Sequence, residues 1–233
     1  MSDPLPIVLI PGLTCSPRLY ADQVPALWRF GPVTVADHTR DDSMAAIARR
    51  ILAAAPPRFA LAGLSMGGYI AFEIMRQARQ RVVKLALLDT GARAETPEQT
   101  ERRKVVIALA KSGRYAEVPD IAFPIYVHRN RHNDADLKQT VRMMAAETGV
   151  EAFLRQQQAI IARPDSRPGL GAIKCPTLVL VGDGDEATPP ELAREIAGAI
   201  GNAHLAVIAD CGHLSTLEQP DKVTAALVDW MNG

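Results

Sequence analysis

The sequence has no apolar run long enough to cross a membrane and no excess of either charge. Its 233 residues carry 26 Lys and Arg against 26 Asp and Glu, so the formal net charge is zero. A basic surplus is typical of nucleic-acid binding, and a membrane-spanning helix needs roughly 18 apolar residues. We therefore expect a small-molecule substrate as the partner, and neither nucleic acid nor a membrane. The oligomeric state is left open.

Cysteine is also scarce, and the N-terminal residues carry no targeting pattern. Cys15, Cys175 and Cys211 lie far apart and form no C-x-x-C pair. Three widely spaced cysteines do not make a disulfide framework and are typical of reduced intracellular thiols. Met1–Pro4 lacks the basic and apolar segments of a secretory signal. Together these features predict a cytoplasmic protein.

What the sequence does contain is a serine between glycines, where an expected strand meets an expected helix. Residues Gly63–Gly68 read Gly-Leu-Ser-Met-Gly-Gly; the apolar run Phe59–Ala62 precedes them and the helical pattern Tyr69–Met75 follows. In this context G-x-S-x-G is typical of a nucleophile elbow, a tight turn that exposes the hydroxyl of Ser65. The flanking glycines avoid side-chain clashes. A glycine-rich turn without chemistry is the alternative.

Two later strand ends carry acids and a histidine. The apolar run Thr177–Val181 leads into the acidic turn Gly182–Pro190, and the strand-like run His204–Ile208 leads into a loop that contains His213. A serine hydroxyl becomes a strong nucleophile when a base accepts its proton and an acid orients that base. The carboxyl ends of parallel strands meet at one edge of a sheet, so we expect both segments to lie near Ser65.

Three blocks, Gly63–Gly68, Gly182–Pro190 and Gly212–Pro220, resemble the α/β-hydrolase superfamily. The resemblance is closest to its small esterase, enol-lactonase and C–C hydrolase branch. It implies a Ser-acid-His order along the chain, with no metal and no other cofactor.

The resemblance also implies a role for each site residue. Ser65 is then the nucleophile and His213 the base. The acid is Asp185, because it is the fourth residue of a G-x-x-D turn. The oxyanion hole consists of the backbone N–H groups of Leu13 and Met66.

The oxyanion assignment of Leu13 depends on a weaker fourth block. Ile7–Leu13 ends in Pro11-Gly12-Leu13, where many relatives have His-Gly and one further residue. Only the backbone N–H of Leu13 is needed, so Pro11 leaves the oxyanion donor in place. Any substrate contact made by the missing histidine is absent.

Other residues compete for roles in the site. Asp89 ends a strand at which some relatives carry their acid, and Asp183 lies two residues before Asp185. For Asp183 a surface turn is the simpler interpretation. For the remaining candidates, packing, loop or surface roles are the simpler interpretations: His38, His204, Cys15, Cys211, Tyr69 and Arg93.

Alternating strands and helices predict an α/β fold, a doubly wound and mostly parallel sheet. Short apolar runs without alternation favour strands buried on both faces. The expected strands are 6–10, 33–36, 59–62, 82–88, 177–181 and 204–208. Met44 to Ala55 carries an apolar stripe at helical spacing, and Thr188–Glu191 reads as a capping box that begins another helix.

The alternation stops between 90 and 172, which we interpret as a helical cap inserted into a core formed by 1–89 and 173–233. The expected cap helices are about 97–112, 115–129, 134–148 and 150–162. Their inward apolar residues should include Phe123, Ile125 and Phe153.

A basic cluster within this insertion has two interpretations. Residues 128–132 read His-Arg-Asn-Arg-His and could draw an anionic substrate. A solvated helix end is the simpler interpretation.

The sequence thus predicts a serine hydrolase that acts on a small ester or lactone. C–C bond hydrolysis, a lyase reaction that uses the triad as a base, and cofactor-free perhydrolysis would use the same residues. A different class of function, a non-enzymatic sensor of a small ligand, also remains open.

Overall fold

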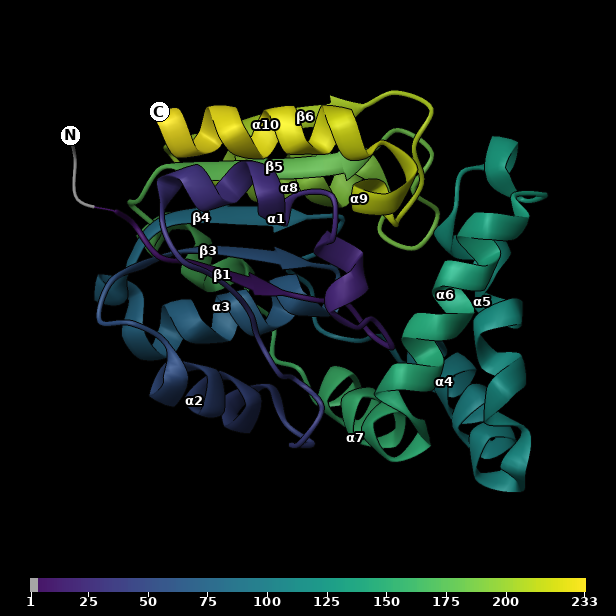
Figure 1. Cartoon of the computed structure of the whole chain (residues 1–233). Helices are drawn as coiled ribbons and strands as arrows, with labels where there is room; N and C mark the ends of the chain where they lie inside the picture. The colour runs from purple at the N-terminus through teal and green to yellow at the C-terminus, as the bar shows by residue number, and fades with distance from the viewer. Residues whose placement is uncertain (1–3) are drawn as a thin grey trace.

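The computed structural model describes residues 4–233 (Figure 1). Met1–Asp3, most of the segment in which we expect no secretory signal, lies outside the described residues. Six strands form one sheet in which every neighbouring pair is parallel. In spatial order the strands are β2 (Val33–Val35), β1 (Ile7–Ile10), β3 (Phe59–Leu64), β4 (Val82–Leu88), β5 (Thr177–Gly182) and β6 (Ala203–Ile208).

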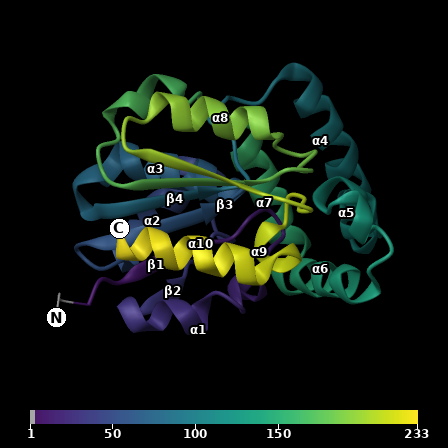
Figure 2. The same ribbon diagram turned by 90° about the horizontal axis from the view of Figure 1, so that it is seen from above.

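Helices cover both faces of this sheet (Figures 1 and 2). On one face lie α1 (Val24–Leu27) and α10 (Pro220–Asn232). On the other lie α2 (Met44–Ala54), α3 (Met66–Ala78) and α8 (Pro190–Ala199). The doubly wound parallel sheet expected from the sequence is confirmed.

The burial of β1 explains its uniformly apolar sequence. Val8 and Ile10 contribute to the core beneath α2 and α3, and Ile7 and Leu9 to the core beneath α1 and α10. Successive side chains of a strand point to opposite faces, so a strand covered on both faces needs apolar residues at every position.

Four helices lie between β4 and β5 in the chain: α4 (Pro97–Leu109), α5 (Val118–Tyr126), α6 (Ala135–Thr148) and α7 (Val150–Ile161). In Figures 1 and 2 they lie beyond the carboxyl ends of the strands. The α5 segment ends at Tyr126, three residues before the expected end at 129. The division into a core of 1–89 and 173–233 and a cap of 90–172 stays a prediction.

The capping box expected at Thr188–Glu191 is wrong. Helix α8 begins at Pro190, its N-cap is Pro189, and no side chain caps it. Thr188 instead bonds to an aspartate in the turn before the helix, and that bond withdraws its hydroxyl from capping. The four-residue α9 (Ser215–Glu218) precedes α10.

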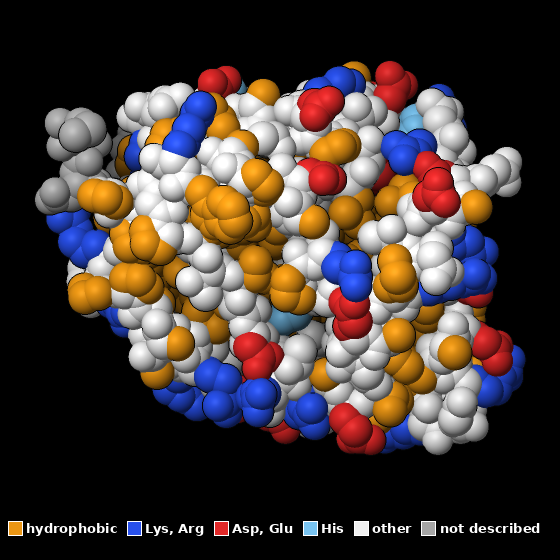
Figure 3. Space-filling view, viewed as in Figure 1, with side chains coloured by type: hydrophobic (Ala, Val, Ile, Leu, Met, Phe, Trp, Pro, Cys, Tyr) orange, Lys and Arg blue, Asp and Glu red, His pale blue; other side chains and the backbone are white. Residues whose placement is uncertain are grey.

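The surface has a mixed character. Figure 3 shows Lys, Arg, Asp and Glu side chains interspersed around the rim of one face, with hydrophobic side chains between them. In the part of the chain that the structure describes, no helix is both long and apolar enough to cross a membrane.

Candidate active site

Ser65 lies in a strained turn between β3 and α3. Its backbone has φ +56° and ψ −114°, outside the regions that L-residues normally adopt. A side-chain carbon added at Gly63 would come within 2.3 Å of the Gly67 carbonyl oxygen, and one at Gly67 within 2.1 Å of the Ile10 oxygen. Only glycine fits at both positions, which explains the G-x-S-x-G spacing as a packing requirement.

Ser65, His213 and Asp185 form a continuous hydrogen-bonded chain. His213 Nε2 lies 2.8 Å from Ser65 Oγ, and His213 Nδ1 lies 2.8 Å from Asp185 Oδ2. A carboxylate only accepts hydrogen bonds, so Nδ1 carries the imidazole proton and Nε2 accepts the serine hydroxyl. His213 and Asp185 are both 3% exposed. The structure therefore brings together three residues that are up to 148 positions apart in the sequence.

The Asp185 carboxylate is held by its own turn. Oδ1 accepts the backbone N–H groups of Ala187 at 2.9 Å and Thr188 at 2.8 Å. Oδ2 accepts the Thr188 hydroxyl at 2.7 Å, which leaves that hydroxyl 3.2 Å from His213 Nδ1. Thr188 is thus part of the site, a role that the sequence pattern did not indicate.

The two competing aspartates make other contacts. Asp183 is exposed, and its carboxylate accepts the backbone N–H of Cys211. Asp89 is fully buried and accepts the N–H of Gly182 at 3.0 Å and the hydroxyl of Ser215. Asp89 therefore joins the end of β4 to the end of β5 and to α9, and its hydrogen bonds do not involve the imidazole.

Burial and neighbouring charges both shift the pKa values of the buried titratable groups. Burial disfavours the charged form of His213, but the Asp185 carboxylate and its hydrogen bond outweigh burial and raise the His213 pKa above 6.5. Burial, and next the nearby Asp185 charge, raise the pKa of Asp89 well above its usual range. The site thus stabilises the imidazolium form of His213 relative to a free imidazole in water.

A loop after β1 passes beside the serine. A side-chain carbon added at Gly12 would lie 3.4 Å from Ser65 Cβ, so the Gly12–Leu13 peptide is adjacent to the nucleophile. The N–H of Leu13 has no acceptor among residues 4–233. Met66 is the first residue of α3, so its N–H has no acceptor within the helix. Both predicted oxyanion donors are therefore unpaired next to Ser65.

The His213 loop is fastened to the end of α5. The backbone N–H groups of His213 and Leu214 donate to the Tyr126 carbonyl at 3.0 and 3.1 Å. The rings of Tyr126 and His213 lie 5.2 Å apart, centroid to centroid. Glu218 is 3% exposed and accepts the N–H groups of Gly212, Leu214 and His128.

The two candidate thiols near the site are poor nucleophiles. Cys15 is buried, its Sγ contacts the Leu13 carbonyl at 3.4 Å, and burial raises its pKa to about 12. Cys211 is fully buried, and burial raises its pKa as well. At neutral pH both remain protonated, and a thiol attacks far more slowly than a thiolate.

The remaining candidates are His204, Arg93, Tyr69 and His38, and none of their side chains is hydrogen-bonded to the Ser65 hydroxyl. His204 is exposed on the edge strand β6, and Arg93 pairs with Glu195 on the surface. Tyr69 is buried beneath the Arg163 guanidinium. His38 lies in the loop after β2, as the sequence interpretation has it; it is 3% exposed and its ring contacts the loop beside Ser65.

A cavity of about 260 Å³ opens between this loop and helices α4 and α5. It borders the site at Leu13 and Tyr126, and the side chains of Ser65, Asp185 and His213 are not part of its lining. Ile125 and Phe153 line it, as the sequence suggested, but Phe123 does not; it packs with the core on the α10 side. The apolar lining is Leu13, Val106, Val118, Pro119, Ile121, Ala122, Ile125, Tyr126, Val141, Phe153 and Ala187, and the polar lining is Thr14, Glu95, Gln99, Arg102, Arg103, Gln157 and Glu186.

The basic cluster at 128–132 does not line this cavity. His128 is buried, and Arg131 pairs with Asp134 and donates to the Glu218 carbonyl. Arg129, Asn130 and His132 are exposed, which agrees with the solvated helix end, whereas His128 and Arg131 make internal contacts.

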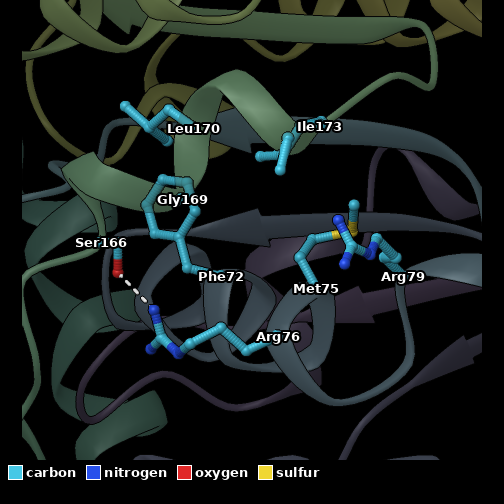
Figure 4. Close-up of a pocket in the computed structure, with 9 residues that line it drawn as sticks. Phe72, Met75, Arg76, Arg79, Ser166, Gly169, Leu170 and Ile173 are labelled. Carbon is cyan, nitrogen blue, oxygen red and sulfur yellow. Dashed lines mark hydrogen bonds between the residues drawn. The ribbon is translucent and has the colours of Figure 1, made fainter.

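A second cavity, of about 220 Å³, lies between α3 and the segment 166–173 (Figure 4). Phe72, Leu170 and Ile173 line it, and Arg76 donates to Ser166 across it at 3.1 Å. None of the predicted site residues borders it. Within residues 4–233 no group of three or more His, Cys, Asp or Glu side chains is placed to hold a metal ion.

Comparisons with known proteins agree with this geometry. A model of the alpha/beta hydrolase family matches residues 7–227. A thermophilic esterase from Thermogutta terrifontis is 30% identical, with a TM-score of 0.88 over 98% of this chain and 89% of the esterase. The enol-lactonase of Burkholderia xenovorans LB400 is 25% identical, with a TM-score of 0.86 over 100% and 93%.

A third relative catalyses a different hydrolysis. It is the 2-hydroxy-6-oxononadienedioate/2-hydroxy-6-oxononatrienedioate hydrolase of Paraburkholderia xenovorans, which is 27% identical over 88% of this chain and 73% of that protein. The match of the family model to nearly the whole chain, together with these likenesses, means that this chain belongs to the alpha/beta hydrolase family.

Proposed function

We propose that this chain is a serine hydrolase that cleaves a small carboxylic ester or lactone through an acyl-enzyme intermediate. The observation that carries the proposal is the chain of two 2.8 Å contacts from Ser65 through His213 to Asp185. A serine, a base and an orienting acid in this order are the parts that acyl transfer requires. The similarity to an esterase and to an enol-lactonase agrees with this choice of substrate.

In the proposed first half-reaction, Ser65 Oγ attacks the carbonyl carbon while His213 Nε2 accepts the hydroxyl proton. The carbonyl oxygen becomes an oxyanion between the N–H groups of Leu13 and Met66. His213 then donates the proton to the leaving oxygen, and the carbon–oxygen bond breaks. Asp185 stabilises the imidazolium throughout, because its carboxylate accepts a hydrogen bond from the Nδ1–H group.

The second half-reaction repeats these steps with water. His213 accepts a proton from water as its oxygen attacks the acyl carbon, and the same two N–H groups hold the second oxyanion. Return of the proton to Ser65 Oγ releases the carboxylic acid. We further propose that residues 90–172 act as a cap and that the apolar wall of α4 and α5 accommodates the acyl group.

The first test is replacement of the nucleophile. Ser65→Ala should abolish hydrolysis of p-nitrophenyl butyrate with an unchanged circular dichroism spectrum, because no other hydroxyl occupies the elbow. In the wild type, a fluorophosphonate should label Ser65 stoichiometrically, as located by peptide mapping. More than a few per cent of wild-type turnover in Ser65→Ala, or a label on Cys15, would contradict the proposal.

C–C bond hydrolysis is the second candidate, because one relative is named as a hydrolase of 2-hydroxy-6-oxononadienedioate, a substrate that contains no ester bond. Both reactions can use the same three residues, so substitution of the triad does not separate them. Parallel assays of short acyl esters, lactones and 2-hydroxy-6-oxo-dienoates do. A kcat/KM for the dienoates well above that for the esters and lactones would assign the chain to C–C hydrolysis.

A further inference from the structure

The direction of the Leu13 N–H depends on the peptide group that contains it. In a planar trans peptide the C=O and the next N–H point in opposite directions. Whatever binds the Gly12 carbonyl therefore also sets where the Leu13 N–H points. This inference rests on the oxyanion role of Leu13 in the proposed function.

The Gly12 carbonyl is bound by a buried histidine. His38 Nε2 lies 2.8 Å from the Gly12 oxygen. A carbonyl oxygen only accepts, so His38 Nε2 carries a proton and donates it. Burial lowers the pKa of His38, so the ring is neutral near pH 7. The Cys15 N–H donates to the same oxygen at 3.1 Å, but it belongs to the loop itself. His38 therefore anchors the loop from outside.

A second side chain holds the other end of the loop. Thr14 has φ +59°, which is unfavourable for a β-branched residue. Its backbone N–H donates to Gln156 Oε1 at 3.1 Å, and Gln156 comes from α7, 142 residues later. The Thr14 hydroxyl donates to the Leu13 carbonyl at 2.6 Å. Both peptide groups that flank Leu13 are thus fixed, one by His38 and one through Gln156.

Packing alone does not account for a glutamine at position 156. It is fully buried, and its Nε2 has no hydrogen-bond partner among residues 4–233. A buried, unpaired amide N–H destabilises a fold relative to an apolar side chain. Its one polar contact is the bond from Thr14, so its contribution is to hold the loop.

We propose that His38 and Gln156 are positioning residues that aim the Leu13 N–H at the oxygen of the substrate carbonyl. His38 adds polarisation, because a donor on the Gly12 carbonyl strengthens the N–H of the same peptide as a hydrogen-bond donor. Neither side chain needs to touch the substrate. Their loss should weaken transition-state binding and leave ground-state binding nearly unchanged.

The test compares His38→Leu, His38→Gln and Gln156→Leu with the wild type. Loss of one whole oxyanion donor costs about 10²–10³-fold in kcat, and a misdirected donor should cost about tenfold or more. We expect that loss in kcat for His38→Leu and Gln156→Leu, with KM within about twofold. His38→Gln should keep most of the wild-type kcat that His38→Leu loses, because a glutamine side-chain amide can donate to the Gly12 carbonyl. His204→Leu, on the exposed edge strand, is the control.

Labelling by a fluorophosphonate gives a readout that is independent of the ester substrate. The phosphoryl oxygen occupies the oxyanion hole, so the rate constant for labelling Ser65 should fall in the same variants by a similar factor. Unchanged labelling and kcat in folded His38→Leu and Gln156→Leu would overturn the inference and leave the proposed function intact. Labelling without turnover of any ester or lactone would reject the proposed function, while the labelling rates would still decide the inference.

Discussion

At the scale of single residues, the triad assignment makes a sharp distinction between two aspartates two positions apart. Asp185 accepts a hydrogen bond from His213 Nδ1–H, whereas Asp183 is exposed and accepts a hydrogen bond only from a backbone N–H. We expect Asp185→Asn to reduce kcat by about 10⁴-fold, as loss of the orienting acid does in serine proteases. Asp183→Asn should stay within a few-fold of wild type. The measurement is kcat for p-nitrophenyl butyrate.

Asp89→Asn completes this series. The carboxylate of Asp89 bonds to Gly182 and Ser215 and not to the imidazole, so its substitution should change stability more than turnover. If Asp89→Asn were inactive and Asp185→Asn were active, the orienting acid would lie at the end of β4 instead of in the turn after β5.

The pH dependence of the reaction follows from the charge next to His213. The base works only when neutral, and the Asp185 carboxylate raises the His213 pKa above 6.5. The kcat/KM of the wild type should therefore rise with pH and reach half its maximum above pH 6.5. Asp185→Asn removes the charge and the hydrogen bond that contribute most to raising the His213 pKa and leaves only the smaller contributions of Asp89 and Glu218 against burial, so the midpoint should move to lower pH. A sensitive fluorogenic ester allows both profiles to be recorded, and a wild-type midpoint below 6.5 would contradict the prediction.

The sequence predicted those residues of the site whose signal is local. Ser65 lies in a strand–turn–helix pattern with glycines that the packing requires, and the blocks around Asp185 and His213 directly follow recognisable strands. His38 and Gln156 could not be found in this way. Each acts through one contact with a loop that is distant in the sequence, and nothing in their neighbours indicates that contact.

At the scale of elements, the strands were predicted closely and the helix starts less well. Six apolar runs correspond to the six strands; the central strands β1, β3, β4 and β5 are largely buried by helices on both faces, whereas the edge strands β2 and β6 are partly exposed. The start of α8 was misplaced because Thr188 fits two roles, a helix cap and a partner of Asp185. In the structure Thr188 takes the second role and donates to Asp185. The local sequence does not distinguish the two roles, because Asp185 and the helix start both lie within a few residues of Thr188.

Helix α5 carries apolar side chains that the core does not bury. Ile121 and Ile125 are 49% and 48% exposed, and both line the cavity that borders the site at Leu13 and Tyr126. If this wall holds the acyl chain, Ile125→Ala should lower the ratio of kcat/KM for p-nitrophenyl octanoate to that for the acetate. Each buried CH₂ contributes about 0.8 kcal/mol, so a loss of several-fold is expected.

The control for this experiment is on the neighbouring helix. Val105 of α4 is 69% exposed and does not line the cavity, so Val105→Ala should leave the ratio unchanged. An equal effect of the two substitutions, or none for Ile125→Ala, would place the acyl group elsewhere.

At the scale of the whole molecule, the helical segment between β4 and β5 is bonded to the loop that carries His213. The Tyr126 carbonyl accepts the N–H groups of His213 and Leu214, and the Glu218 carboxylate links both sides of His213 to His128. A side-chain carbon on Gly212 would lie 2.4 Å from the backbone nitrogen of His128, so the two segments are in close contact. The segment that contains α5 is therefore hydrogen-bonded to the loop that carries His213.

This attachment predicts that Glu218 matters for stability and turnover together. Glu218→Ala leaves three backbone N–H groups without their acceptor, and each buried, unpaired group costs about 1–3 kcal/mol. We expect the free energy of unfolding to fall by at least about 2 kcal/mol. The kcat should fall as well, because the His213 loop loses two of its bonds, while KM changes little.

Urea unfolding followed by circular dichroism and steady-state kinetics on a short ester measure the two effects. Glu191→Ala is the matched control, because Glu191 is exposed and pairs only with Arg194 on the surface, where such a pair contributes little. A Glu218→Ala protein that unfolds at the same urea concentration as Glu191→Ala would show that the link is dispensable. Loss of stability with an unchanged kcat would show that the Tyr126 carbonyl alone keeps His213 in position.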